Sequence, residues 1–220
     1  MNKMSIFKIF ILLIIIFMLL CSCLGLEQTN PKIECYTLDY AATPMAGFGE
    51  LSHIIKVRRF TVAPLYNTNR IIYQDQAFKR DAYIYHRWLV HPKDMISHLL
   101  TRDFQCSGLF KAVLPYDSPL SALYTLDGNV EEFLERDLDA EWEALLTIRI
   151  MLIHKDEKQN SDQILFQETY HKKSSCKRKH PAALVEAMSL NMFVVSREIV
   201  KDIYEYLKNH ETMNQKSIQG

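Results

Sequence analysis

The apolar residues of this chain follow two different periods, and each period predicts a different kind of element. Toward the C-terminus they recur every three or four residues from Leu184 to Tyr206, which predicts an amphipathic helix over residues 181–208. Over residues 141–154 the even positions are apolar and the odd positions are mixed, which predicts a strand with one buried face. The apolar even positions are Trp142, Ala144, Leu146, Ile148, Ile150 and Leu152.

Shorter patterns predict a second helix and the rest of a sheet. Pro92 is suited to a first helical turn and Gly108 to the residue that ends a helix, so we predict a helix over residues 91–108. Short runs rich in β-branched and aromatic residues predict the other strands. These runs cover residues 35–39, 53–63, 70–74, 81–86, 109–114 and 163–170.

One local motif is a strong turn signal. The Asp127-Gly128 pair is typical of a tight turn with positive φ, so we predict a hairpin between strands 121–126 and 130–135. The full order is then a run of strands, a helix, a β-meander and a long helix. This order predicts a single α+β domain, in which a mostly antiparallel sheet is packed by a mid-chain helix and a long C-terminal amphipathic helix.

The N-terminus has a pattern of its own. Residues 9–20 are uninterrupted apolar residues, preceded by the cations Lys3 and Lys8. Twelve helical residues span about 18 Å, well short of the ~30 Å hydrocarbon core of a bilayer. A positive start followed by a short apolar stretch is typical of a secretory signal peptide.

The segment after this stretch, Leu20-Cys21-Ser22-Cys23, resembles a bacterial lipobox. In such proteins the signal is cut before the second cysteine, whose sulfur then carries a diacylglyceryl group. The resemblance implies lipid attachment at Cys23, and Leu24 rather than Asp after it implies the periplasmic face of the outer membrane. An uncleaved signal anchor, or a plain signal peptide with incidental cysteines, is the alternative.

These features predict the organisation of the chain. We expect a lipoprotein signal peptide over residues 1–22, the lipidated cysteine with a linker over 23–33, a globular domain over 34–208 and a polar tail over 209–220. The full chain has 220 residues, with 26 basic and 26 acidic side chains. Loss of residues 1–22 removes two lysines and no acid, which leaves a net charge of −2. A charge near zero argues against nucleic acid as a partner.

Positive charge is concentrated in one place. Residues 171–180 hold five Lys or Arg and no acid. This run has two interpretations: a contact with anionic head groups or an acidic partner, or a solvated loop between the last strand and the last helix. The second interpretation is favoured.

Residue patterns typical of catalysis are absent from the sequence. It has no Gly-x-Ser-x-Gly, no glycine-rich phosphate loop and no His-Glu-x-x-His, and its eight histidines are scattered. Ser52 and His53 are adjacent, but neighbouring strand residues face opposite ways. We therefore predict no enzyme activity, no catalytic residue, no cofactor and no metal site. A lipid-anchored hydrolase remains an alternative.

Three cysteines remain in the mature chain: Cys35, Cys106 and Cys176. Cys106 and Cys176 are a conceivable disulfide pair in the oxidising periplasm. The other interpretation is three buried or half-buried free thiols.

Several motifs, in this order and spacing, resemble the ABC-type transport auxiliary lipoprotein family. The resemblance covers residues 34–208. One departure is Tyr-Asn-Thr-Asn at residues 66–69, where relatives often have Tyr-Leu-Asp-Arg. The motifs are Tyr36-x-Leu38, Phe60-Thr61-Val62-Ala63-Pro64-x-Tyr66, Ile71-Ile72-Tyr73, Tyr83, Trp88, Pro92, Ser107-Gly108-Leu109-Phe110, Tyr124-x-Leu126-x-Gly128-x-Val130-x-x-Phe133 and Ala182-Ala183.

This resemblance implies a non-catalytic component of a lipid or organic-solvent transport system. The implied partners are an ABC permease with its ATPase and a periplasmic protein with a mammalian-cell-entry (MCE) domain. Assembly with further copies of the chain is also implied as possible. We interpret Trp88, Tyr73, Tyr83 and Pro64 as core and turn residues rather than ligand contacts. A general envelope assembly or structural lipoprotein is the alternative function.

Overall fold

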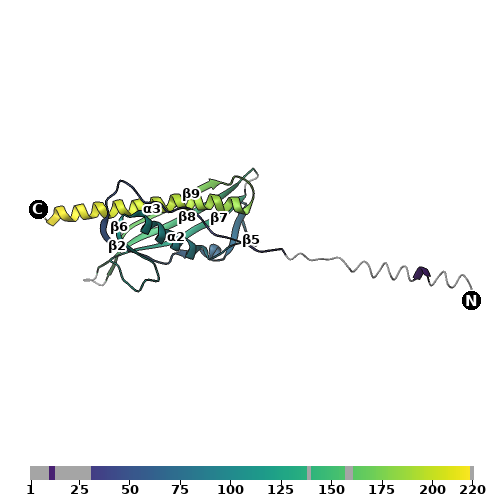
Figure 1. Cartoon of the computed structure of the whole chain (residues 1–220), viewed down its shortest axis with the longest axis horizontal. Coiled ribbons are helices and arrows are strands. Elements are labelled where there is room, and N and C mark those ends of the chain that lie inside the picture. The colour runs from purple at the N-terminus through teal and green to yellow at the C-terminus, as the bar shows by residue number, and fades with distance from the viewer. Residues whose placement is uncertain (1–9, 13–30, 138–139, 157–160, 219–220) are drawn as a thin grey trace, which may run out of the picture. The chain divides into compact units, whose positions relative to one another are not determined.

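The computed structural model describes residues 10–12, 31–137, 140–156 and 161–218. The chain divides into two units, residues 1–32 and 33–220, and the second contains the sheet and both long helices. The elements of this unit, labelled in Figure 1, are β1 (Glu34–Tyr36), β2 (Leu51–Val57), β3 (Thr61–Val62), η1 (Pro64–Tyr66), β4 (Arg70–Gln76), β5 (Lys79–Trp88), α2 (Pro92–Ser107), β6 (Phe110–Leu114), β7 (Tyr124–Asp137), β8 (Trp142–Asp156), β9 (Ser161–Ser175) and α3 (Pro181–Ile218).

The described strands form one sheet organised around β7. Along one edge β7 pairs with β8, and β8 pairs with β9, both antiparallel and over most of their length. Along its other edge β7 pairs in parallel with β2, then β3, then β4. β5 continues the sheet beyond β4, and β1 lies at the edge next to β5. The predicted α+β domain is confirmed; the sheet is mixed, because short parallel strands join the long antiparallel ones.

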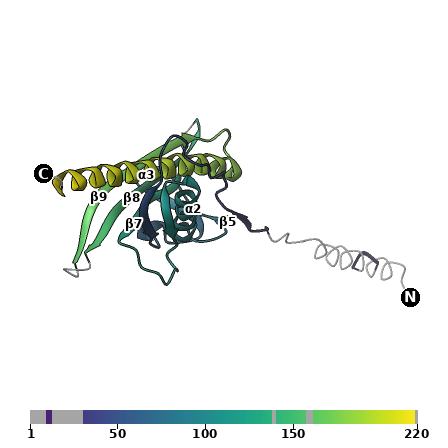
Figure 2. The ribbon, with the colours of Figure 1, turned by 60° about the vertical axis from the view of Figure 1, so that its left-hand side comes forward.

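Both long helices lie on the same face of this sheet, as Figure 2 shows. The even positions of β8 face them: Ile148, Ile150 and Leu152 are fully buried, as the alternation predicted. The apolar stripe of α3 covers these positions, and Met188, Met192 and Ile199 are likewise fully buried. The core therefore lies between one sheet face and two helices.

The two ends of α2 follow the sequence prediction. Pro92 occupies its first turn, and Gly108 ends it with φ of 70° in the left-handed region that glycine tolerates. The other helix is longer than predicted, since α3 continues to Ile218 rather than to residue 208. The strand predicted over residues 53–63 is split into β2 and β3.

The predicted hairpin at Asp127-Gly128 is wrong. β7 runs through both residues without a turn, and Gly128 does not have positive φ. Gly128 pairs with Ile150 of β8, in a ladder that extends over nearly the whole of β7. A Cβ at Gly128 would overlap the ring of Phe60, which is almost completely buried. The glycine is needed because an aromatic ring lies directly on its backbone.

Candidate functional site

The predicted lipid-attachment residue, Cys23, lies outside the described residues, so acylation there stays a prediction. Cys35, Cys106 and Cys176 are described and are free thiols in the structure. Cys176 is buried, as one interpretation expected, whereas Cys35 and Cys106 are exposed, so the prediction of three buried or half-buried thiols is wrong for these two.

The basic run at residues 171–180 is only partly a loop. Residues 171–175 belong to β9, where successive side chains face opposite sides of the sheet, so the expectation of one solvated loop is wrong for them. Acidic partners lie close to three of the lysines. Lys173 is 3.0 Å from Glu143, Lys177 is 3.2 Å from Glu186 and Lys179 is 2.7 Å from Asp137. The charge of the run is therefore largely balanced where it stands.

The sheet face opposite the helices carries paired charges. Glu143, at an odd position of β8, is 95% buried at its side chain and accepts ion pairs from Arg136 and Lys173. Burial raises the pKa of Glu143, but hydrogen bonds from Lys173 and Arg136 outweigh it and hold the pKa below its usual value. Farther along the same face Arg149 is 2.6 Å from Glu131. This open face therefore carries ion pairs at several described positions.

One hydroxyl on this face contacts a histidine. Thr147 Oγ1 donates to Glu132 Oε2 at 2.6 Å and lies 2.9 Å from His171 Nδ1. A hydrolytic triad needs the hydroxyl proton to pass to histidine, with the carboxylate on the other ring nitrogen. Here the carboxylate binds the hydroxyl itself, so the contact is a structural bridge between strands.

The adjacent pair Ser52 and His53 also separates as the strand geometry predicts. The Ser52 side chain is exposed, whereas His53 Nε2 lies 2.8 Å from Glu211 of α3 and its ring packs against Tyr124. His53 therefore contacts the far part of α3 from the sheet. The two side chains do not form a nucleophile and base.

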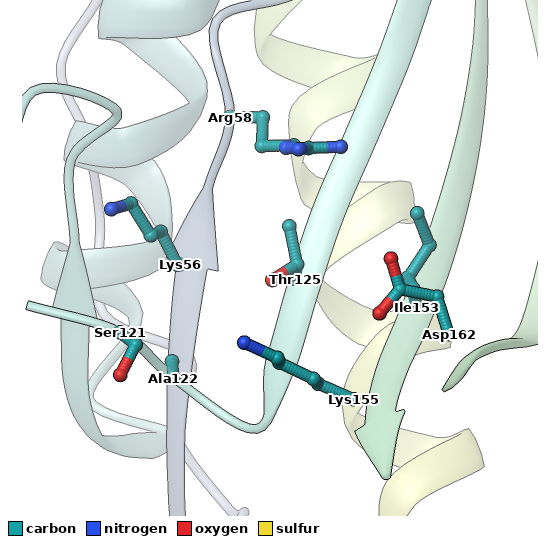
Figure 3. Close-up of a pocket in the computed structure, with 8 residues that line it drawn as sticks. All are labelled: Lys56, Arg58, Ser121, Ala122, Thr125, Ile153, Lys155 and Asp162. Carbon is teal, nitrogen blue, oxygen red and sulfur yellow. The ribbon is translucent and has the colours of Figure 1, made fainter. Parts of the chain in front are cut away.

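A pocket of about 240 Å³ lies on the open face where β2 and β8 end and β7 begins (Figure 3). Figure 3 shows Lys155 extending from β8 toward β2, and Arg58 extending over β7. Lys56 Nζ donates to the carbonyl oxygens of Ser118 and Leu120 at 2.8 and 3.0 Å. The lining residues are Lys56, Arg58, Ser121, Ala122, Thr125, Ile153, Lys155 and Asp162.

Figure 3 shows Lys155 pointing into the pocket, where its ammonium can bind a small anion or the carboxylate of a partner, whereas Lys56 points away from the other lining groups. Part of the positive charge is already balanced, because Arg58 lies 3.1 Å from Asp127. None of the described lining residues is a histidine or a cysteine, and the one carboxylate among them is that of Asp162. Sequence reasoning missed this site because its cations come from strands that are far apart in the chain.

A larger cavity of about 570 Å³ follows α2. Its walls are apolar where Leu38, Met95 and Leu99 contribute, and Arg59 lies at 2.7 Å from Asp94 beside them. An apolar group with an anionic end fits this combination of walls and charges. Among the described residues no group of three His, Cys, Asp or Glu side chains is arranged to hold a metal ion.

Glu135 is the carboxyl group with the least ordinary environment. A bulge between Val130 and Glu132 shifts the register of β7, so that Glu135 pairs with Ala144 and faces the helices, where it is fully buried. Tyr83 Oη donates to both of its oxygens, at 2.9 and 3.2 Å. Burial raises the pKa of Glu135 to about 7, and the hydrogen bond from Tyr83 offsets only part of that increase.

We expect Glu135→Gln to flatten the pH dependence of stability. The ordinary pKa of the group is 4.5, so between pH 4.5 and about 7 the folded state keeps a proton that the unfolded state releases. The free energy of unfolding of the wild type therefore falls as pH rises through this window and levels off above it. The loss amounts to about 3 kcal/mol at most, at 1.36 kcal/mol per pKa unit.

Urea unfolding at about pH 5 and about pH 8 measures this loss. From the lower to the higher pH, the free energy of unfolding should fall more for the wild type than for Glu135→Gln. Glu186→Gln, which alters an exposed carboxyl group, serves as the matched control and should follow the wild type. Parallel pH profiles for wild type and Glu135→Gln would contradict the assignment.

None of the helices in the described part of the chain is both long and apolar enough to cross a membrane. The fold itself has solved relatives. A Xanthomonas campestris protein of the DUF330 family superimposes with a TM-score of 0.72, at 18% identity over 81% of this chain and 99% of its own. A second, uncharacterised protein matches with a TM-score of 0.60, at 15% identity over 78% of this chain and 99% of its own. No curated protein matches the sequence significantly.

Family membership follows from the sequence match rather than from these distant structures. The model of the ABC-type transport auxiliary lipoprotein component matches residues 36–200. The match spans most of the sheet, α2 and α3 as far as Val200, which are elements that build the core and the open face. This chain therefore belongs to the ABC-type transport auxiliary lipoprotein family.

Proposed function

We propose that the protein is a lipid-anchored, non-catalytic subunit of an ABC-type lipid or organic-solvent transport system. Cys23 attaches it to the periplasmic face of the outer membrane. There it docks or receives the periplasmic apparatus, which consists of an MCE-domain protein and an ABC permease with its ATPase. The observation that carries this proposal is the family match over residues 36–200 in a chain with a lipobox-like segment at residues 20–23.

Two features of the described fold support a docking role. The open sheet face has charged groups fixed in ion pairs, which favours specific recognition of a complementary surface. The pocket of Figure 3 adds the ammonium of Lys155 at the end of that face. Both are binding features, which fits an accessory subunit whose chemistry is performed by an ATPase elsewhere.

Transport between the two membranes tests the proposal. In cells that lack this lipoprotein, transfer of pulse-labelled phospholipid between inner and outer membranes should slow, or tolerance of organic solvent should fall. The wild-type gene should restore the affected property, whereas the unanchored Cys23→Ala form should not. Deletion cells that match the parent in both measurements would contradict the proposal.

The residue after the lipidated cysteine tests the choice of membrane. Leu24→Asp should retain the acylated protein in the inner membrane, because Asp at this position is the retention signal of proteobacterial lipoproteins. Leu24→Ala should leave it in the outer membrane. Density-gradient separation of the two membranes measures the change. Equal distributions for Leu24→Asp and wild type would contradict the outer-membrane placement.

A further inference from the structure

The edge formed by β1 and β5 exposes apolar side chains beside arginines. In the parallel register of these strands Cys35 lies next to Arg87, and the backbone N–H of Leu89 donates to the carbonyl oxygen of Tyr36. Leu89 is 64% exposed, and Ile33 and Tyr85 are 45% and 43% exposed. Soluble domains usually bury side chains of this kind, so a cluster of them at one edge indicates a contact surface.

This edge carries two arginines and one carboxylate, that of Glu34 on β1. Arg70 of β4 pairs in register with Arg87 of β5, which brings two guanidinium groups to the same edge. Within the described residues neither arginine forms an ion pair, and Arg87 Nε is buried without a hydrogen-bond partner. The nearest acid on β1, Glu34, accepts from Tyr36 and lies 3.4 Å from His86 instead. The edge is therefore ready to accept an anionic group.

The position of this edge in the chain indicates that it lies near the bilayer. Ile33 is ten residues after Cys23, so an extended linker reaches about 35 Å at most. An acylated Cys23 would keep the edge within that distance of the bilayer surface. Apolar and aromatic side chains next to arginines are the combination that binds membrane interfaces, since the apolar groups enter the headgroup region and the cations contact anionic lipids.

We propose that Ile33, Cys35, Tyr85, Arg87 and Leu89, with Arg70, form a membrane-contact patch. It rests on the bilayer that holds the lipid anchor, with anionic headgroups on the two arginines. This inference depends on the proposed anchor at Cys23. It extends that proposal by stating which edge of the domain faces the membrane.

The exposed thiols supply a test within the chain itself. Full-length acylated protein is reconstituted in vesicles of phosphatidylethanolamine and phosphatidylglycerol that contain lipids brominated on their acyl chains. A fluorophore on Cys35, in a Cys106→Ser background, should lose about half of its intensity, since interfacial groups lie within ~5–10 Å of the acyl boundary. A fluorophore on Cys106 at the far end of α2, in a Cys35→Ser background, should keep its intensity.

Variants of exposed residues separate the contributions of the apolar and the cationic side chains to membrane contact. Leu89→Asp and Arg70→Glu should each restore most of the Cys35 intensity, and vesicles of phosphatidylcholine alone should quench less than anionic ones. Leu120→Asp is the matched control, because Leu120 is 62% exposed in the loop before β7, at the other end of the sheet. Thermal unfolding checks that all variants are folded.

The two proposals fail in different ways. Mass spectrometry that finds no acyl chain on Cys23 would overturn the anchor and the patch together. Acylated protein whose Cys35 label stays as bright as the Cys106 label would overturn the patch alone. Quenching at Cys35 that Leu89→Asp and Leu120→Asp reduce equally would also overturn it.

Discussion

Cys23→Ala is expected to abolish acylation and to release the domain from the membrane fraction or leave it unprocessed. The lipid is held through the cysteine sulfur, and alanine has no equivalent atom. Each buried CH₂ contributes about 0.8 kcal/mol to membrane binding, so loss of two or three acyl chains removes nearly all of the anchoring free energy. The membrane-contact patch alone gives reversible and salt-dependent attachment.

Labelled palmitate and membrane fractionation measure this effect, and intact mass reports whether the signal has been cut. Cys21→Ala is the matched control, because the proposed cleavage before Cys23 would remove Cys21 with the signal peptide. It should be acylated and fractionate as the wild type does. Palmitate uptake by Cys23→Ala at the wild-type level, or its loss in Cys21→Ala, would contradict the assignment of the anchor.

Gly128→Ala is expected to destabilise the domain by about 1–3 kcal/mol, the usual cost of overpacking a core. The added methyl group would overlap the ring of Phe60, which is 1% exposed and cannot move toward solvent. The backbone N–H of Phe60 also donates to Ser97 Oγ of α2 at 2.9 Å, which holds the segment in place. In a domain of this size the change corresponds to a fall in Tm of roughly 3–10 °C.

A double-mutant cycle separates this clash from a general loss of backbone freedom. Phe60→Leu replaces the ring with a smaller side chain. Gly128→Ala should therefore lower the free energy of unfolding clearly less in that background than in the wild type. Gly49→Ala is the control, since nothing lies within 4 Å of its added Cβ and its φ is not positive. Additive effects of Gly128→Ala and Phe60→Leu would show that the ring contact is not the cause.

Local periodicity predicted the elements whose environment is uniform along their length. The even positions of β8 and the apolar stripe of α3 face one continuous core along most of their length. Their periodic pattern is therefore visible in the sequence. Gly108 was also predictable, because the positive φ that ends α2 depends on glycine alone. These parts of the fold need no information from distant residues.

Other features depend on contacts between distant segments. The turn signal at Asp127-Gly128 was misleading, because pairing with β8 and the ring of Phe60 require an extended glycine there. The burial of Glu135 follows from a bulge that exchanges the two faces of β7. The cations of the Figure 3 pocket and the β1–β5 edge come together only when the sheet is assembled.

The central claim, that this lipoprotein is a subunit of an ABC-type transport system, is tested most directly by crosslinking in intact cells. Wild-type protein with an affinity tag is crosslinked, solubilised and purified, and its partners are identified by quantitative mass spectrometry against the Cys23→Ala form. We predict enrichment of an MCE-domain protein together with an ABC permease or its ATPase. Enrichment of other envelope proteins, with none of these three above the Cys23→Ala background, would contradict the account.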